Sequence, residues 1–255
     1  MMYRLNKFSR TELLIGNENI EKLKNYKVAV FGIGGVGSYV VEGLVRAGIY
    51  HIALIDDDKI CLTNLNRQIH ATTKTVGMDK VEAMKQRILD INPKAVVDVY
   101  KTFVSYDNAD ELIKNDFDYI VDAVDTITAK LALIETAKKK NIPIISCMGA
   151  ANKLDPTQFK ITDISKTYMC PVARIIRKKL RQKNINSLKV LFSPEEPIKP
   201  KSENIATCKN ACVCPAGTKR KCSIKNQIPG SISFVPSVAG LIISGQVIKD
   251  LLDIN

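Results

Sequence analysis

One short unit near the N-terminus constrains the fold more than any other part of the chain. The apolar run Lys27–Phe31 leads into Gly-x-Gly-Gly-x-Gly, and the segment Val36–Ala47 follows with apolar residues at helical spacing. This is the order of a buried strand, a tight turn and a helix. Backbone N–H groups at the start of such a helix bind phosphate. The sequence therefore predicts a phosphate-binding turn built from Gly32, Gly34, Gly35 and Gly37.

The same alternation of strands and helices continues through the first 165 residues. Four further apolar runs predict strands, namely His51–Ile55, Ala95–Tyr100, Asp118–Val121 and Ile142–Ser146. Two segments with helical periodicity predict helices, namely Met78–Ile91 and Ile127–Lys140. A succession of βαβ units of this kind favours a doubly wound, mostly parallel α/β sheet. We assign residues 1–165 to this part.

In residues 166–255 the regular alternation of strands and helices stops. We predict that this part forms an α+β extension, and that the whole chain, residues 1–255, is a single domain. Cys170-Pro171 predicts the start of a helix, because proline is tolerated in the first helical turn. Leu188–Phe192 predicts a strand, and Val238–Leu252 predicts a C-terminal helix. Between them, residues 194–229 are rich in Pro, Lys, Asn and Cys and lack apolar periodicity, which favours a long functional or disordered loop.

The charge of the chain favours a polyanionic partner. The formal net charge is +12 and the sequence pI is about 9.3, although hydrophobic content is an ordinary 45%. Nucleic acid ranks ahead of an anionic membrane as the partner. A protein from a lysine-rich proteome would show the same excess without any such partner.

The chain reads as cytoplasmic. The N-terminus has no apolar signal segment, so the seven cysteines favour reduced thiols or metal ligands over disulfides. The longest apolar stretch, Phe234–Leu252, is interrupted by Gln246, Lys249 and Asp250. We therefore expect a buried helix there rather than a membrane span.

Polar residues after the second strand point to a nucleotide rich in phosphate. Asp56 ends the strand, where a carboxylate accepts hydrogen bonds from ribose, and Asp58 follows two residues later. Arg67 offers bidentate binding to phosphate oxygens, and Lys80 offers a point charge at a helix start. Taken alone, the acidic residues would suit a solvated loop and Lys80 a solvated surface.

Asp122 and Asp125 follow the Asp118–Val121 strand, at the sheet edge where ligands bind. One of them is suited to hold Mg²⁺ against phosphate oxygens. A competing role for Asp125 is to cap the helix that begins after Thr126. The sequence leaves both roles open.

A basic stripe in the second part predicts contact with RNA. Arg174, Arg177, Lys178 and Arg181 recur at helical spacing, while Val172, Ile175, Ile176 and Leu180 fill another face. One face would pack on the core as the other meets phosphates. A solvated charged face is the competing interpretation.

Four cysteines in the loop form a dense thiol cluster, Cys208, Cys212, Cys214 and Cys222. Four thiolates suit a tetrahedral zinc site. A redox-labile loop, a sulfur-relay thiol with a protein partner, or unpaired cysteines explain the cluster equally well. Cys61 and Cys147 are expected to be structural, because their neighbours are apolar or typical of strands.

Together these motifs resemble the adenylate-forming superfamily of ubiquitin-activating-like (ThiF-type) enzymes, which share a Rossmann-like sheet. The matching motifs are Gly32-x-Gly-Gly-Val-Gly, Asp56-x-Asp, Asn64-Leu-Asn-Arg-Gln68, Val76-Gly-Met-Asp-Lys80 and Asp122-x-x-Asp125. The resemblance implies that Asp56 binds ribose, that Asn64, Arg67 and Lys80 bind the triphosphate of ATP, and that Asp125 holds Mg²⁺. It also implies a homodimer, in which Arg10 is lent to the neighbouring subunit's ATP.

The second part resembles one branch of that superfamily, the transfer RNA threonylcarbamoyladenosine dehydratases. The matches are Asp163-Ile-Ser-Lys-Thr, Cys170-Pro-Val-Ala-Arg174, Leu188-Lys-Val-Leu-Phe-Ser193 and Phe234-Val-Pro-Ser-Val-Ala-Gly240. Such an enzyme uses ATP to adenylate the carboxylate of the modified nucleoside and close a ring, releasing AMP and pyrophosphate. The runner-up is an adenylyltransferase for the C-terminal Gly-Gly of a ubiquitin-like sulfur carrier, whose paired Cys-x-x-Cys motifs this chain lacks.

Overall fold

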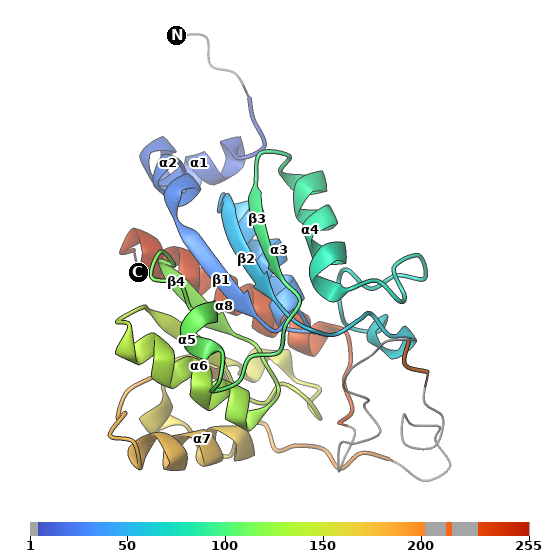
Figure 1. Ribbon diagram of the computed structural model, residues 1–255, viewed down its shortest axis with the longest axis vertical. Coiled ribbons are helices and arrows are strands. Elements are labelled where there is room, and N and C mark those ends of the chain that lie inside the picture. The colour runs from blue at the N-terminus through green and yellow to red at the C-terminus, as the bar shows by residue number, and fades with distance from the viewer. Residues whose placement is uncertain (1–4, 202–212, 216–228, 255) are drawn as a thin grey trace.

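One sheet of seven strands forms the centre of the molecule (Figure 1). The computed structural model describes residues 5–201, 213–215 and 229–254. In spatial order the strands are β3 (Val96–Tyr100), β2 (His51–Ile55), β1 (Lys27–Phe31), β4 (Tyr119–Asp122), β5 (Ile144–Cys147), β7 (Lys189–Phe192) and β6 (Lys160–Asp163). All neighbours pair in parallel except β6, which runs antiparallel to β7 at the edge. The predicted doubly wound, mostly parallel sheet is confirmed.

Helices cover both faces of the sheet (Figure 1). One layer contains α3 (Gly37–Ala47), α4 (Lys80–Ile91) and α8 (Phe234–Leu252), and the other contains α5 (Ala109–Leu112), α6 (Ile127–Lys139) and α7 (Pro171–Arg181). Strand alternation builds both cores, since Val28 and Val30 pack toward the first layer while Ala29 and Phe31 pack toward the second. Each central strand is therefore apolar on both sides, which explains its continuous apolar run.

Two helices begin at positions other than those predicted. α4 begins at Lys80 rather than at Met78. Asp79, the residue before it, has extended backbone and bridges Lys59. Met78 lies in a bend, where its N–H donates to Thr75 O and its carbonyl accepts from Ile60 N–H at 2.8 Å. α8 begins at Phe234, four residues before Val238, and accommodates Pro236 in its first turn.

Four elements were not predicted from the sequence. They are α1 (Ser9–Ile15), α2 (Asn17–Asn25), α5 and β6. α1 has no buried residue and therefore shows no apolar face directed at the core. α5 and β6 have four residues each, too few to display a periodicity. In Figure 1, α1 and α2 lie at the end of the sheet where β1 begins.

The apolar C-terminal segment packs as a core helix, as predicted. Within the described residues, α8 is the one helix long and apolar enough to cross a membrane, but half of its apolar window is buried. Its residues Val235, Ala239, Ile243 and Val247 join the same core as α3. The two helices approach closely at Gly240, where a Cβ atom would lie 2.5 Å from the carbonyl oxygen of Val36.

The strand order creates a crevice at one end of the sheet. β1 and β4 are neighbours, and the chain leaves β1 for β2 on one side and leaves β4 for β5 on the other. Doubly wound sheets bind ligands at such a switch point, outside the carboxyl ends of the strands. Here those ends are Gly32 and Ala123, which are in tight contact: a Cβ atom on Gly32 would meet the Ala123 backbone at 2.8 Å.

Candidate active site

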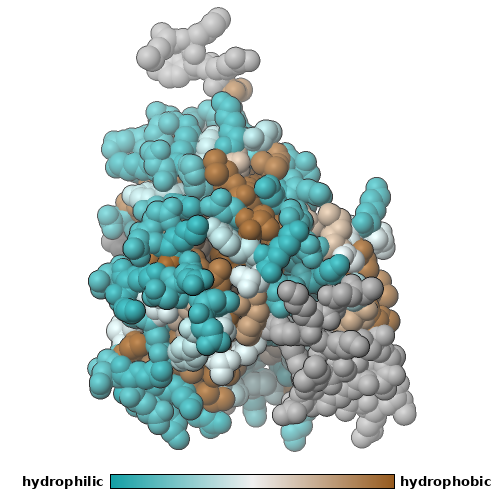
Figure 2. Space-filling view, viewed as in Figure 1, coloured by the Kyte–Doolittle hydropathy of each residue, from teal (hydrophilic) through white to brown (hydrophobic). Residues whose placement is uncertain are grey.

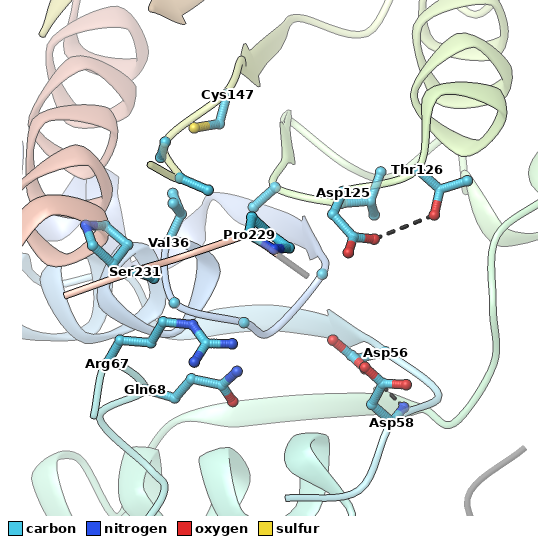
Figure 3. A pocket seen from close by; sticks show the side chains of 18 of the residues that line it. Val36, Asp56, Asp58, Arg67, Gln68, Asp125, Thr126, Cys147, Pro229 and Ser231 are labelled. Atoms are coloured by element: carbon cyan, nitrogen blue, oxygen red, sulfur yellow. Dashed lines mark hydrogen bonds between the residues drawn. The ribbon is translucent and has the colours of Figure 1, made fainter. Parts of the chain in front are cut away.

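A cavity of about 1120 Å³ opens at the carboxyl ends of the parallel strands (Figure 3). Its walls come from the glycine turn, the segments after β2, β4 and β5, and the start of α7. Typical small-molecule sites measure roughly 300–1,000 Å³. The cavity therefore has room for a nucleotide and part of a second ligand.

The glycine turn forms one wall with its backbone. Gly32 has φ of +88°, a conformation that only glycine adopts readily, and its N–H donates to Ile55 O. A Cβ atom on Gly37 would lie 1.8 Å from the carbonyl oxygen of Gly32, so any side chain there would break the turn. A Cβ atom on Gly34, by contrast, would meet nothing within 4 Å. That open space lets a phosphate approach the backbone at the start of α3.

A buried ion pair lies beside the turn. Lys80 Nζ lies 2.7 Å from Asp58 Oδ2 and 4.0 Å from Asp56 Oδ1, and the residue is only 6% exposed. Burial alone would lower the pKa of Lys80, but the charges of Asp56 and Asp58 outweigh it and raise that pKa above its ordinary value. Lys80 is therefore a fixed cation at the cavity wall and not a solvated surface residue.

Asp56 connects this pair to the glycine turn. Its carboxylate accepts from the N–H of Ile33 at 2.7 Å and from the N–H of Asp58 at 2.8 Å. The side chain thereby fixes both loops while still lining the cavity. Figure 3 shows Asp56 and Asp58 on the side opposite Arg67 and Gln68.

The segment after β2 supplies the opposite side. Asn64 ends the 3-10 turn Leu62–Asn64, and its Oδ1 accepts from Cys61 N–H at 3.0 Å. Arg67 Nη1 donates to Thr63 O at 2.9 Å, which aims the guanidinium across the cavity (Figure 3). Gln68 is 5% exposed and lies next to it. The structure thus brings Asn64, Arg67, Gln68 and Lys80 together around one cavity.

The two predicted carboxylates after β4 have different surroundings. Asp125 lines the cavity, its charge acts on Lys80, and its Oδ1 accepts from the hydroxyl of Thr126, the N-cap residue of α6. Asp122 is fully buried, forms an ion pair with Lys130 at 3.1 Å and accepts from the Ser146 hydroxyl. Asp122 is therefore a structural carboxylate that does not line the cavity, which corrects its assignment as a nucleotide ligand.

The exposed basic stripe on α7 has three of the four predicted residues. Arg174, Lys178 and Arg181 are exposed, and Figure 2 shows hydrophilic side chains over the region of α7. Arg177 instead turns inward, where its Nη1 donates to Thr167 O at 2.7 Å and Ile164 O at 3.3 Å. Arg177 thus holds the turn before α7, which corrects its assignment to the RNA-facing stripe. Ile175 is also 43% exposed and does not pack in the core as expected.

Arg10 lies outside the cavity of its own chain. It is an exposed residue of α1, at the end of the sheet away from the cavity (Figure 1). Arg10 does not line the cavity of its own chain, and its contact with the ATP of a second subunit stays a prediction.

Three of the four clustered cysteines, Cys208, Cys212 and Cys222, lie outside the described residues. Cys214 lies within them, is partly buried and lines the cavity. The zinc site and the sulfur-relay thiol therefore stay predictions. Cys61 and Cys147 are buried, as expected, and burial raises the pKa of the Cys147 thiol to about 12.

The far end of the cavity contains residues that sequence reasoning missed. The segment after β5 contributes Met148 to Lys153 there. Phe103 and Val104, from the chain after β3, line the cavity as well and were also missed. The one signal that would have found them is their place directly after the carboxyl ends of two strands. Lys153 is the most unusual of them, because it is a buried cation, 4% exposed.

Comparison with known proteins identifies close relatives along the whole chain. The model of the ThiF family matches residues 8–255. A protein of Bacillus subtilis named tRNA threonylcarbamoyladenosine dehydratase is 46% identical over 249 residues, which are 97% of this chain and 95% of the relative. The similarity thus includes the extension beyond residue 165.

Solved structures agree with this result. The tRNA N6-threonylcarbamoyladenosine dehydratase of Escherichia coli in complex with ATP aligns with a TM-score of 0.83 and 31% identity, covering 97% of this chain and 94% of that chain. The same enzyme in complex with AMP aligns equally well, with 32% identity. A probable molybdopterin-synthase adenylyltransferase of Pyropia yezoensis is 42% identical, but over only 49% of this chain.

Proposed function

The chain belongs to the ThiF family, and from that premise we propose that it dehydrates N6-threonylcarbamoyladenosine in tRNA with ATP. The observation that carries this conclusion is the extent of the similarity to dehydratases, which continues through α7 and α8. The relative named a probable molybdopterin-synthase adenylyltransferase matches only 49% of this chain, so the sulfur-carrier alternative has less support. The enzyme is ATP-dependent and forms an adenylate.

The reaction has two bond exchanges. An oxygen of the threonyl carboxylate attacks the α-phosphorus of ATP, and pyrophosphate leaves with the electron pair of the broken P–O bond. An atom of the neighbouring carbamoyl group then attacks the acyl carbon of this adenylate. The C–O bond to AMP breaks, AMP leaves with that electron pair, and the carbamoyl group loses one proton. The oxygen lost by the nucleoside departs on AMP, so the net result is dehydration with ring closure.

The residues around the nucleotide end of the cavity suit the first exchange. The open backbone at Gly34 admits phosphates, and Lys80 and Arg67 supply cationic charge from two sides. The Asp56 carboxylate would accept hydrogen bonds from the ribose hydroxyls, and the Gln68 amide would bind another polar group of the nucleotide. Charged and polar groups that are already in position stabilise the charge that develops in the transition state without having to reorganise, and this is usually the largest contribution to catalysis. We assign these contacts to ATP.

A magnesium ion fits the same end of the cavity. Asp125 is a cavity-lining carboxylate whose charge already acts on Lys80, and Mg²⁺ typically takes one or two carboxylates plus phosphate oxygens. Asp125 would hold the ion. The ion supplies charge neutralisation for the departing pyrophosphate.

The chain forms a homodimer in this proposal. α1 has no buried residue, and Leu13 and Leu14 on it are 86% and 87% exposed, while Leu5 before it is 90% exposed. Contiguous apolar exposure of this kind marks an interaction surface. A second copy of the chain covering α1 would bring Arg10 to the partner's cavity.

Mixing two inactive variants tests the dimer. We expect Arg10→Ala and Lys80→Met each to abolish activity when alone, whereas a mixed dimer would contain one cavity that lacks neither residue. We expect the mixture to recover roughly a quarter of wild-type activity after subunit exchange, by random pairing. A mixture that stays inactive although mass photometry detects dimers contradicts the lending of Arg10.

The substrate tRNA lies along α7 in this account, and the enzyme works in the cytoplasm with its substrate. The exposed cations Arg174, Lys178 and Arg181 run from the cavity end of α7, where Pro171 and Val172 line the cavity. Backbone phosphates beside the modified nucleoside would meet these cations as the nucleoside enters the cavity.

Exchange of radiolabelled pyrophosphate into ATP separates the two candidate substrates. We expect exchange when tRNA carrying the linear modification is present and none with unmodified tRNA. The control is a ubiquitin-like sulfur carrier ending in Gly-Gly. Exchange that depends on the carrier and ignores the tRNA would establish the runner-up function instead.

A further inference from the structure

The far end of the main cavity holds a buried cation without a carboxylate partner. Three lysines that line this cavity are at least nine-tenths buried: Lys80, Lys130 and Lys153. Lys80 pairs with Asp58 and Lys130 pairs with Asp122. Among the described residues, no carboxylate oxygen lies within 4 Å of Lys153 Nζ, which donates to the backbone carbonyl of Glu195.

The carboxylate of Glu195 binds backbone N–H groups and forms no ion pair with this lysine. It accepts the backbone N–H groups of Leu154 at 2.8 Å and Asp155 at 3.1 Å. Burial lowers the pKa of Lys153 from its ordinary value, and the charge of Glu195 only partly opposes this. A buried cation in that situation gains free energy from any anion that enters the cavity.

The backbone around Lys153 is fixed on both sides. Asn152 N–H donates to Gly230 O at 2.9 Å, and Asn152 Oδ1 accepts from Gly230 N–H at 2.6 Å. Ile198 N–H donates to Asn152 O at 2.8 Å. The ammonium group is therefore positioned before any ligand binds, which lowers the entropic cost of binding.

The surroundings of Lys153 favour a small anionic group on an otherwise neutral ligand. Met148, Cys170 and Val172 line the same end of the cavity and are apolar or uncharged. This end adjoins the start of α7, whereas Asp56, Lys80 and Arg67 occupy the nucleotide end. A backbone phosphate of RNA is linked to nucleotides on both sides, so it could reach Lys153 only if the RNA backbone itself entered the cavity. A nucleoside side chain that ends in a carboxylate enters by itself.

We propose that Lys153 binds the threonyl carboxylate of the modified nucleoside and holds it for adenylation. This inference rests on the proposed function and adds the residue that recognises the activated group. The ion pair forms with the unactivated carboxylate and weakens once adenylation removes its negative charge. Lys153 therefore discriminates between the linear nucleoside and a neutral analogue.

Binding of two anticodon stem–loop RNAs tests the proposal. One carries the linear modification with its carboxylate, and the other carries the matching carboxamide, which has the same shape without the charge. Dissociation constants are measured with the full chain saturated with an ATP analogue that has a methylene group in place of the oxygen between the α- and β-phosphates, so that adenylation cannot occur. We expect wild type to prefer the carboxylate by about 10- to 100-fold, the range for a hydrogen bond to a charged group.

The variant Lys153→Gln is the critical one, because its amide N–H can still donate to Glu195 O while its charge is gone. We expect its preference for the carboxylate to fall below about threefold and Lys153→Arg to retain part of it. Lys139→Met, on a side chain that is 77% exposed at the end of α6, is the control and should behave as wild type.

Three outcomes separate the explanations. If Lys153→Gln keeps the full preference, or weakens binding of both RNAs equally, Lys153 has a structural role or binds a backbone phosphate, and the proposal is wrong. Thermal unfolding of each variant identifies any loss of fold, in which case Lys153→Arg alone decides by its retained preference. If wild type does not convert the linear nucleoside at all, the proposed function itself fails.

Discussion

At the scale of single residues, the buried His70 makes the stability of the fold depend on pH. It is 3% exposed, and neither ring nitrogen has a hydrogen-bond partner among the described residues. Burial, together with the charges of Lys80 and Arg87, lowers the pKa of His70 to about 3. The folded protein thus holds this imidazole neutral.

The pH dependence of stability follows from that shift. Between pH 6.5 and 3 the unfolded chain binds a proton at His70 that the folded protein excludes, so stability falls as the pH is lowered through this window. We expect the His70 contribution to the free energy of unfolding to drop by about 1 kcal/mol from pH 7.5 to pH 5.5. Urea unfolding of wild type and His70→Gln at both pH values measures it.

The His70→Gln variant should show a shallower pH dependence of stability than wild type, because it has no imidazole to protonate at position 70. Identical slopes for wild type and His70→Gln would mean that His70 does not stay neutral in the fold.

The places of the site residues were predictable from the sequence, except where partners from distant elements decide. Asp56 and Asp125 line the cavity because they follow closely on strands whose carboxyl ends meet there, and Arg67 and Lys80, which the family resemblance assigns to the same site, line it as well. Asp122 obeys the same rule but is neutralised by Lys130, which comes from α6. No sequence pattern shows that a lysine eight residues later turns inward.

At the scale of elements, two glycines of the turn are needed for different reasons: Gly37 for the folding of the turn, and Gly34 for the binding of phosphate. Gly37→Ala would place a Cβ atom 1.8 Å from the Gly32 carbonyl oxygen, and we expect it to lower the free energy of unfolding by about 2 to 3 kcal/mol. Gly34→Ala meets no protein atom within 4 Å, so we expect stability within about 0.5 kcal/mol of wild type. Its ATP affinity should nevertheless fall at least tenfold.

Denaturant unfolding and calorimetric titration with ATP check this pair of glycine variants. A Gly34→Ala protein that binds ATP as wild type does would show that phosphates do not approach the turn. A stable Gly37→Ala protein would contradict the close packing of turn and strand.

The exposed cations of α7 lead to a prediction about tRNA binding. Replacing Arg174, Lys178 and Arg181 together by glutamine removes three exposed cations. We expect weaker tRNA binding and a salt slope smaller by about 1 for each phosphate that the variant no longer neutralises, measured by titration at several salt concentrations. Lys22→Gln on α2, far from the cavity, should leave the slope unchanged. An unchanged slope in the triple variant would remove α7 from the RNA interface.

Elements with strong periodicity were predicted well, and elements without a core-facing stripe were not. The bounds of β1 and β2 agree residue for residue with the sequence prediction, because both strands are continuous apolar runs. α1 has no fully buried residue, and Ile15 at its end is the residue of α1 that packs against the core, so its apolar residues gave no pattern to detect. In the dimer proposed here, those same residues pack against a second copy.

At the scale of the whole molecule, the cavity unites the two parts of the chain. Its nucleotide end is lined by the glycine turn and the segment after β2, and its far end by the segment after β5 and the start of α7. The residues before α8 contact both ends, since Asn66 donates to Ser231 O and Asn152 pairs with Gly230. Such a division suits an enzyme that holds ATP on one side and a nucleoside on the other. Which nucleoside enters is the claim on which the account depends.

Mass spectrometry of digested tRNA tests that claim most directly. The protein is incubated with ATP, Mg²⁺ and tRNA carrying the linear threonylcarbamoyl modification, and the nucleosides and AMP are quantified together. The account predicts that the modified nucleoside loses the mass of one water and that one AMP appears for each nucleoside converted. A nucleoside of unchanged mass, or AMP formed without any conversion, would contradict it.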